Sequence, residues 1–171
     1  HGLYQPELDA ELVELLYKSA PLHDIGKVGI SDAILRKPGR LDAEEFAIMR
    51  THARLGRDAI ANAERYFGGT TSFLTIAKEM AYSHHERWDG QGYPDGLAGE
   101  AIPLCGRIMA IADVYDALVS DRVYKAAIPH AEAVKVIEAE RGRHFDPALV
   151  DVFLEIAPVF LEINSQFGNP V

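Results

Sequence analysis

Apolar residues recur at helical spacing along almost the whole chain, and no segment shows the sustained alternation of a half-buried strand. Leu8, Leu12, Leu15 and Leu16 lie on one face of such a helix, which is expected to end near Pro21. The chain has 171 residues, of which 48% are hydrophobic, and this is enough for one sizeable core. The sequence therefore predicts a single all-α domain.

Capping signals place several of the other helices. Asp42 followed by Glu45 is a capping-box pattern, and it predicts a long helix to residue 66 with His52 in its interior. Asp146 and Pro147 suit the N-cap and the first position of a C-terminal helix. Further helices are expected over residues 72–84, 107–119 and 130–140.

A long irregular loop is predicted between two of these helices. Residues 88–103 are rich in glycine and include two prolines, so neither a helix nor a strand fits them. An irregular loop of this length inside a compact domain is more often functional than idle.

The chain is acidic. Its 17 Lys and Arg residues against 26 Asp and Glu residues give a net charge of −9. A surface of this sign disfavours binding to DNA and to anionic membranes. An anionic substrate would need a local group of cations, for which bound metal and four basic side chains are candidates: Lys27, Arg87, Arg122 and Lys125.

Cysteine content and hydropathy bear on the compartment. The single cysteine, Cys105, excludes an internal disulfide and is expected to be a structural thiol. No apolar run is long enough to cross a bilayer, and the N-terminus lacks the basic-then-apolar pattern of a signal peptide. These features predict a cytoplasmic protein without a membrane span.

Histidine and aspartate residues form three clusters. His23 precedes Asp24, His84 precedes His85, and Asp113 interrupts an apolar helix, where a carboxylate needs a partner. Imidazole and carboxylate without thiolate are the ligands of a hydrolytic metal centre, and the mixture favours iron or manganese over structural zinc. The clusters therefore predict a metallophosphohydrolase.

The order of the motifs adds a family resemblance. The pairs at residues 23–24 and 84–85 are followed by Gly-Tyr-Pro at residues 92–94 and by Ser-Asp-Arg-Val-Tyr-Lys at residues 120–125. Over about residues 15–153 the chain resembles the HD-GYP family of cyclic di-GMP phosphodiesterases. The resemblance implies an HD-domain helical bundle with an extended GYP loop and additional C-terminal helices. It also implies hydrolysis of cyclic di-GMP to linear pGpG or GMP in bacterial signalling.

The resemblance further implies two divalent metal ions. Asp24 would bridge the two ions and would be a catalytic residue. His23 and Asp113 would complete the coordination of one ion. The other ion would be held by His52, His84 and His85. His52 taken alone would more often be a satisfied core residue, and it is a ligand candidate only in this company.

Four further residues are candidates for contact with substrate. Lys27, three residues after Asp24, would contact a phosphoryl oxygen or protonate the leaving alkoxide, and an ordinary surface lysine is the alternative. Arg122 and Lys125 carry donors for phosphate. Tyr93 offers a ring for stacking on guanine and a hydroxyl for a phosphate. The family's loop is also linked to binding of GGDEF-type cyclase domains.

The chain departs from the family pattern near its N-terminus. Relatives place a Glu and a His four residues apart on a helix upstream of the His-Asp pair, and no such pair precedes His23. We therefore expect residues 1–171 to form a single HD-GYP domain that lacks an upstream helix and any N-terminal sensory or receiver domain. A catalytically impaired regulatory domain that binds nucleotide or a protein partner stays open beside the enzyme. A mononucleotide hydrolase is a third hypothesis, which the Gly-Tyr-Pro loop disfavours.

Overall fold

Secondary structure is helical throughout the described part of the chain. The computed structural model describes residues 8–67, 69, 71–121 and 126–167. The α-helices are α1 (Ala10–Ser19), α2 (Asp32–Leu35), α3 (Ala43–Arg50), α4 (His52–Phe67), α5 (Ser72–Ser83), α6 (Leu104–Val119), α7 (His130–Ala139) and α8 (Pro147–Phe167). Short 3₁₀ turns occur at η2 (Ala20–Leu22), η3 (Ile25–Gly29) and η4 (Gly99–Ala101). These residues contain no β-strand, so the predicted all-α fold is confirmed.

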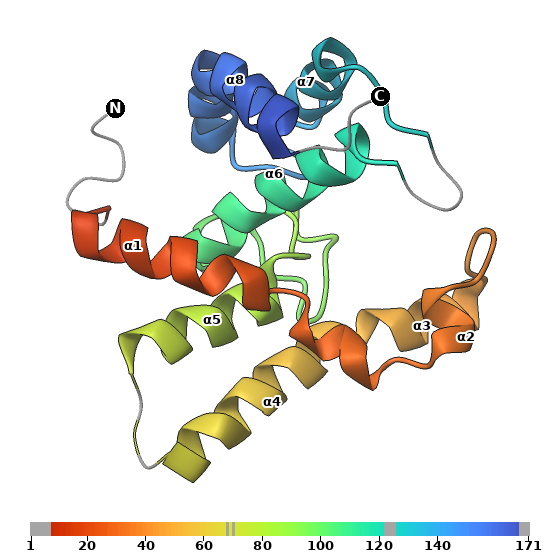
Figure 1. Cartoon of the computed structure of the whole chain (residues 1–171), viewed down its shortest axis with the longest axis vertical. Helices are drawn as coiled ribbons and strands as arrows, with labels where there is room; N and C mark the ends of the chain where they lie inside the picture. The colour runs from red at the N-terminus through yellow and green to blue at the C-terminus, as the bar shows by residue number, and fades with distance from the viewer. Residues whose placement is uncertain (1–7, 68, 70, 122–125, 168–171) are drawn as a thin grey trace.

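Helix α6 runs through the middle of the molecule, between two groups of helices (Figure 1). Helices α1, α4 and α5 lie on one side, with α5 packed against both α1 and α4, and α7 and α8 lie on the other. Helices α2 and α3 extend away from this body (Figure 1). Because α6 contacts helices on both sides, most of its surface is covered, which explains its apolar sequence.

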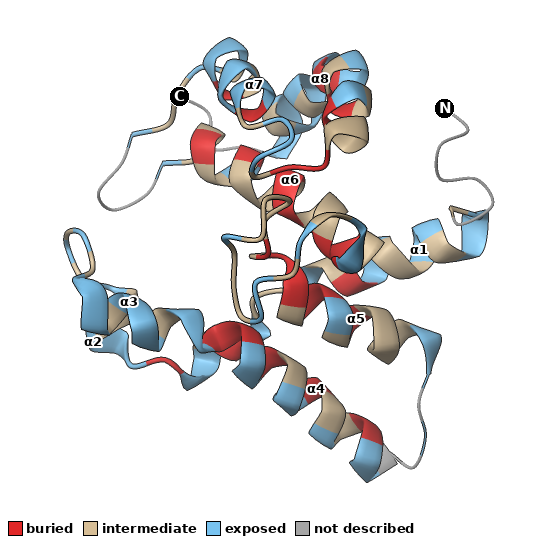
Figure 2. Cartoon of the chain, turned by 180° about the vertical axis from the view of Figure 1, so that it is seen from behind, coloured by how far each residue is buried: buried red, intermediate tan, exposed pale blue. Residues whose placement is uncertain are grey.

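The larger hydrophobic core lies between α6, α7 and α8. Tyr115, Ile137 and Phe153 are almost fully buried there, and burial of a side chain of this size stabilises the fold by about 1.5–3 kcal/mol. Figure 2 shows buried residues along α6, α5 and one side of α4. A smaller cluster joins α4 to α5 and is formed by Ile60, Ala77 and Ala81.

The helix predicted over residues 42–66 is wrong in one respect, because the structure divides it in two. A capping box starts α3 as predicted, but α3 ends at Arg50 and α4 begins at His52. Between them, the hydroxyl of Thr51 donates a hydrogen bond of 2.7 Å to the carbonyl of Ile48, a local bond that competes with regular helix. His52 therefore lies at the start of a helix rather than in the interior of one.

The remaining predicted elements agree with the structure within a few residues. Helix α6 begins at Leu104, one turn earlier than expected, and η4 interrupts the irregular loop over residues 88–103. The backbone N–H of Ala148 donates to Asp146 Oδ1 at 2.9 Å, which confirms Asp146 as the cap of α8. No helix among the described residues is long and apolar enough to cross a membrane.

Candidate metal centre

The segment that carries His23 and Asp24 is held against the start of α4. His23 directly follows η2, and Asp24 directly precedes η3. A Cβ atom on Gly26 would lie 1.9 Å from the carbonyl oxygen of His52 and 2.4 Å from the backbone nitrogen of Gly56. Only glycine therefore lets this segment approach α4 so closely, and the approach brings Asp24 next to His52.

Three histidines are oriented by the same device. The Nδ1–H groups of His23 and His52 each donate a hydrogen bond of 2.7 Å to the backbone carbonyl three residues earlier. His84, which follows the last residue of α5, donates from Nδ1 to the carbonyl of Met80 at 3.0 Å. A carbonyl can only accept, so Nδ1 carries the proton and Nε2 is left as a free ligand atom.

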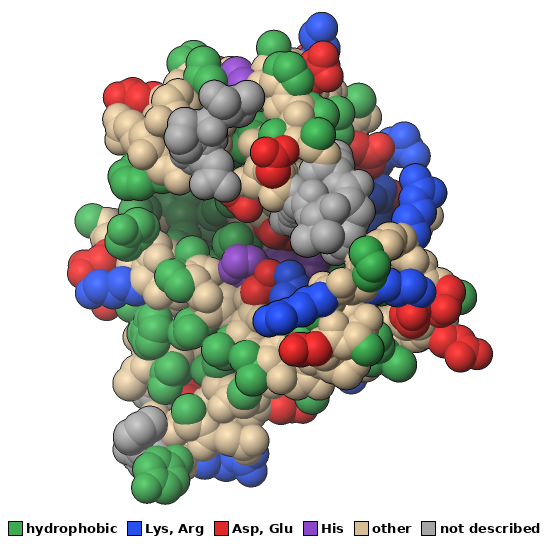
Figure 3. Space-filling model, turned by 45° about the vertical axis from the view of Figure 1, so that its right-hand side comes forward, with side chains coloured by type: hydrophobic (Ala, Val, Ile, Leu, Met, Phe, Trp, Pro, Cys, Tyr) green, Lys and Arg blue, Asp and Glu red, His purple; other side chains and the backbone are tan. Residues whose placement is uncertain are grey.

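The Nε2 atoms of these histidines converge on Asp24. Asp24 Oδ1 lies 3.4 Å from His52 Nε2 and 3.8 Å from His84 Nε2. Asp24 Oδ2 lies 3.3 Å from His23 Nε2, which is in turn 3.9 Å from Asp113 Oδ1. Figure 3 shows histidine, acidic and basic side chains meeting in a recess on this face of the molecule.

The six residues form two overlapping groups. Within each group the potential ligand atoms all lie within 4.8 Å of one another. One group joins His23, Asp24 and Asp113. The other joins Asp24, His52, His84 and His85. Asp24 is the residue that belongs to both groups.

Buried polar atoms without partners mark the middle of this cluster. Asp24 Oδ1, His52 Nε2 and His84 Nε2 are buried and have no hydrogen-bond partner in the described part of the chain. Leaving such an atom unsatisfied costs about 1–3 kcal/mol, and buried polar groups in native proteins are nearly always paired. A divalent cation coordinated by all three atoms would satisfy them, so the residues fit a metal ion.

Burial keeps the imidazoles of the second group neutral. Burial lowers the pKa of His52, and it lowers the pKa of His84 to about 4 with a further contribution from nearby His23. Burial and the adjacent His84 lower the pKa of His85 to about 2. Neutral imidazole is the form that binds a metal, so these residues need not lose a proton first near neutral pH.

Asp24 is ionised, and Lys27 lies beside it. Burial would raise the pKa of the Asp24 carboxyl, but the neighbouring His23 imidazole and Lys27 ammonium hold that pKa well below its usual range. The Lys27 ammonium forms an ion pair with Asp24 Oδ2, and 39% of its side chain is exposed. Lys27 therefore borders the cluster from the solvent side, the position that a contact with a phosphoryl oxygen requires.

The glycine-rich loop is fixed to the residues that follow α5. A Cβ atom on Gly92 would lie 2.4 Å from the backbone nitrogen of Arg87, so glycine is required at this close approach. The buried carboxylate of Glu86 accepts the backbone N–H groups of Asp95 at 2.8 Å and of Leu97 at 3.0 Å. The backbone of the glycine-rich loop is thus held against the segment that carries His84 and His85.

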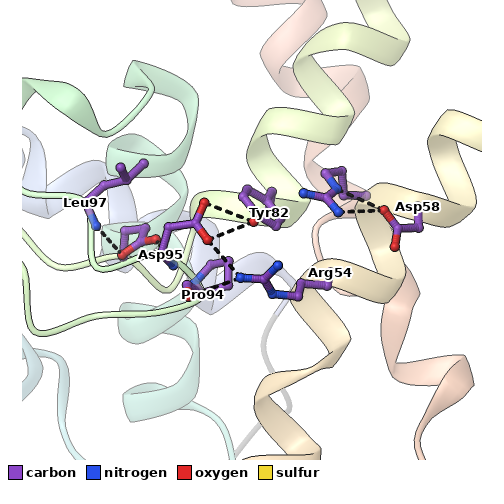
Figure 4. Close-up of polar contacts among 8 residues, drawn as sticks. Arg54, Asp58, Tyr82, Pro94, Asp95 and Leu97 are labelled. Carbon is purple, nitrogen blue, oxygen red and sulfur yellow. Dashed lines mark hydrogen bonds and ion pairs between the residues drawn. The ribbon is translucent and has the colours of Figure 1, made fainter.

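Asp95 anchors the tip of the loop on the helices behind it. The hydroxyl of Tyr82 on α5 lies 3.0 Å from both Asp95 oxygens, and the guanidinium of Arg54 on α4 is 2.8 Å from Asp95 Oδ1 (Figure 4). At the other end of the loop, Arg87 pairs with Asp89 at 3.0 Å and with Glu140 at 3.2 Å. Arg87, named above as a candidate cation for an anionic substrate, is thus paired with two carboxylates at this end of the loop.

Tyr93 lies against the cluster of candidate metal ligands rather than free in solvent. Its ring stacks on His85 with centroids 4.7 Å apart and an interplanar angle of 28°. The guanidinium of Arg50 lies over the same ring, 4.7 Å from its centroid. Tyr93 therefore supports His85, and its stacking on guanine stays a prediction.

Some predicted residues lie away from the cluster or outside the described residues. Arg122 and Lys125 fall in residues 122–125, which the structure does not describe. Asp116 is exposed and accepts the hydroxyl of Ser120 at 3.2 Å. Cys105 is buried, and burial raises the pKa of its thiol to about 12, in keeping with a structural role. Sequence reasoning missed Glu86 and Arg50, because neither carries a local signal of what the loop brings next to it.

Comparison with known proteins identifies related chains. A family model described as HD domain matches residues 5–149. A cyclic di-GMP phosphodiesterase of Vibrio cholerae serotype O1 is 57% identical over 166 residues, which make up 97% of this chain and 34% of that protein. A 3′3′-cGAMP-specific phosphodiesterase 2 of the same organism is 43% identical over 169 residues, or 99% of this chain and 30% of that protein. The chain thus spans about a third of the length of these curated relatives.

A solved structure shares the fold. The crystal structure of a cyclic GMP-AMP specific phosphodiesterase of Vibrio cholerae matches with a TM-score of 0.64 at 24% identity, over 96% of this chain and 45% of that one. The match agrees with the helical arrangement around α6, and the curated relatives agree with the resemblance inferred from the motifs. With the family model matched over residues 5–149, this chain belongs to the HD domain family.

Proposed function

We propose that this chain is a metal-dependent phosphodiesterase domain that hydrolyses cyclic di-GMP. The observation that carries the proposal is Asp24, whose two oxygens belong to two separate groups of potential ligands. The ions of a two-metal site lie only about 3.5–4 Å apart, and a carboxylate that belongs to both groups could bind to two ions at that separation. The absence of thiolate from both groups supports iron or manganese as the metals.

The residues would divide the work as follows. His23, Asp24 and Asp113 would hold one ion. His52, His84 and His85, with the other oxygen of Asp24, would hold the second. When bound, divalent ions supply an activated water and neutralise charge on the phosphoryl oxygens.

Hydrolysis adds water to phosphorus and breaks one P–O3′ bond, and the leaving oxygen takes up a proton. Lys27 has ammonium protons at the edge of the cluster, so it would donate to a phosphoryl oxygen or to this leaving oxygen. Tyr93 would fix the orientation of His85 through the stacked rings. Arg122 and Lys125 remain proposed phosphate contacts.

The choice of cyclic di-GMP rests on similar proteins. A relative 57% identical to this chain is named a cyclic di-GMP phosphodiesterase, and one 43% identical is named specific for 3′3′-cGAMP. The greater similarity to the first supports cyclic di-GMP. A cytoplasmic location belongs to the same proposal and is supported by the single, buried, unpaired cysteine. Binding of a GGDEF-type partner through the loop remains a prediction.

The test is hydrolysis by protein loaded anaerobically with iron or manganese. We expect linear pGpG or GMP from cyclic di-GMP, separated by chromatography, with a higher kcat/KM than for 3′3′-cGAMP. Protein stripped of metal is the control and should be inactive. Binding of cyclic di-GMP without turnover at full metal content would instead support the catalytically impaired regulatory domain.

A further inference from the structure

A small pocket, lined in part by Tyr93, opens beside the cluster of candidate metal ligands. It has a volume of about 170 Å³ and lies between the end of α3, the start of α4 and the glycine-rich loop. Its lining residues are Ala47, Arg50, Thr51, Arg54, Tyr93 and Pro94. Two of the six are arginines, which is notable in a chain of net charge −9.

The two arginines differ in their partners. Arg54 is held by Asp95, with 2.8 Å between the guanidinium and the carboxylate (Figure 4). Arg50 is exposed, and no carboxylate among the described residues lies within ion-pair distance of it. The donors of Arg50 are therefore available to a ligand, whereas those of Arg54 are already engaged.

Tyr93 fixes the place of the free guanidinium. The Arg50 guanidinium lies 4.7 Å above the Tyr93 ring centroid, and that ring stacks on His85 at 4.7 Å. A guanidinium over an aromatic ring is held by the attraction of its positive charge to the electron-rich face of the ring. The N–H groups along its edge remain available to donate hydrogen bonds to two oxygens of a ligand. The Arg50 guanidinium, a bidentate donor, is thus separated from the proposed metal ligand His85 by the ring of Tyr93.

We propose that Arg50 binds the second phosphate of the cyclic dinucleotide, the one that is not being hydrolysed. The inference rests on the proposed function, because a cyclic dinucleotide carries two phosphodiesters and only one can lie at the metal centre. Lys27, the other described cation at the cluster, is paired with Asp24. Among the described cations at the cluster, Arg50 lacks a carboxylate partner, so its donors are available for a second anionic site.

If Arg50 binds the second phosphate, its replacement should affect substrates with two phosphates and not those with one. A cyclic dinucleotide uses the Arg50 contact, whereas bis(4-nitrophenyl) phosphate has one phosphate and does not. Loss of a hydrogen bond to a charged group costs about 1.5–3 kcal/mol, which corresponds to a factor of about ten or more in binding. Arg50→Gln should therefore raise KM for cyclic di-GMP about tenfold or more and leave hydrolysis of bis(4-nitrophenyl) phosphate unchanged.

The experiment compares wild type, Arg50→Gln, Arg50→Lys and the control Arg40→Gln. Arg40 is an exposed arginine that precedes α3 and does not line the pocket. Metal content and circular dichroism should be the same for all four proteins. Arg50→Lys should recover part of the affinity, since it keeps the charge but loses the bidentate geometry, and Arg40→Gln should behave as wild type.

The outcomes distinguish this inference from the proposed function. An unchanged KM for cyclic di-GMP in Arg50→Gln, or an equal loss of activity with both substrates, would overturn the role of Arg50 and leave the proposed function standing. Wild-type protein that carries metal but never hydrolyses cyclic di-GMP would overturn the proposed function. In that case equilibrium binding of cyclic di-GMP still tests Arg50, because the same variant should bind it at least about tenfold more weakly.

Discussion

Among single residues, Asp24 has the most demanding position. Its side chain is only partly exposed, and its oxygens lie within 4 Å of the Nε2 atoms of His23, His52 and His84. It is also the residue that the two ligand groups share. No other side chain in the described cluster can replace it, because the remaining residues each contact one group.

Replacement of Asp24 by Ala should strip at least one metal ion and abolish hydrolysis. Both effects follow from removal of the carboxylate shared between the two groups. Elemental analysis after anaerobic loading measures the metal, and circular dichroism verifies that the variant is folded. Full metal content with wild-type turnover in this variant would show that the proposed centre is wrong.

Gly26 offers a test of how the site is packed. A methyl group at this position would meet the carbonyl oxygen of His52 at 1.9 Å, whereas one at Gly69 would meet open space. Overpacking of this kind typically costs about 1–3 kcal/mol, so Gly26→Ala should unfold at lower urea concentration and lose metal affinity. Gly69→Ala is the matched control. Equal stability of the two variants would mean that η3 does not approach α4 as described.

At the scale of elements, the glycine-rich loop depends on one buried carboxylate. Glu86 is 2% exposed and accepts two backbone N–H groups from the far part of the loop. Through this contact the loop is attached directly behind His85, and Tyr93 is brought onto the His85 ring. The order of the loop and the geometry of the second ligand group are therefore coupled.

Glu86→Ala should loosen the loop and weaken the metal site. The change removes the carboxylate that accepts the N–H groups of Asp95 and Leu97, and loss of a hydrogen bond to a charged group costs about 1.5–3 kcal/mol. Amide hydrogen exchange at these two residues should become faster, while exchange in α7 and α8 should not change. Glu100→Ala, an exposed acid in the same loop, is the control. Unaltered exchange at Asp95 in Glu86→Ala would rule out the proposed attachment.

At the scale of the whole molecule, the candidate centre joins segments that are distant in sequence. Its residues come from the η2–η3 turn, from α4, from the end of α5 and from the middle of α6. Helix α6 is also the wall of the larger hydrophobic core. Bound metal would therefore cross-link the α4–α5 half of the fold to α6.

The sequence predicts the chemistry of this centre better than its surroundings. Adjacent His-Asp and His-His pairs are visible without a structure, because packing alone seldom needs two polar neighbours at a helix end. The break at Thr51 was not predicted, since the capping box at Asp42 marks where α3 begins and gives no sign of where it ends. Arg50 contacts a loop residue more than forty positions away in the sequence, and Glu86 contacts loop residues about ten positions away. No local sequence pattern encodes either contact.

The most direct test of the central claim is anomalous X-ray diffraction from crystals of the protein loaded anaerobically with manganese. We expect two neighbouring anomalous peaks, with Asp24 in contact with both. One peak should lie against His23 and Asp113, and the other should lie against His52, His84 and His85. A single peak away from Asp24, or no peak in this cluster at full metal loading, would show that these residues do not hold two ions.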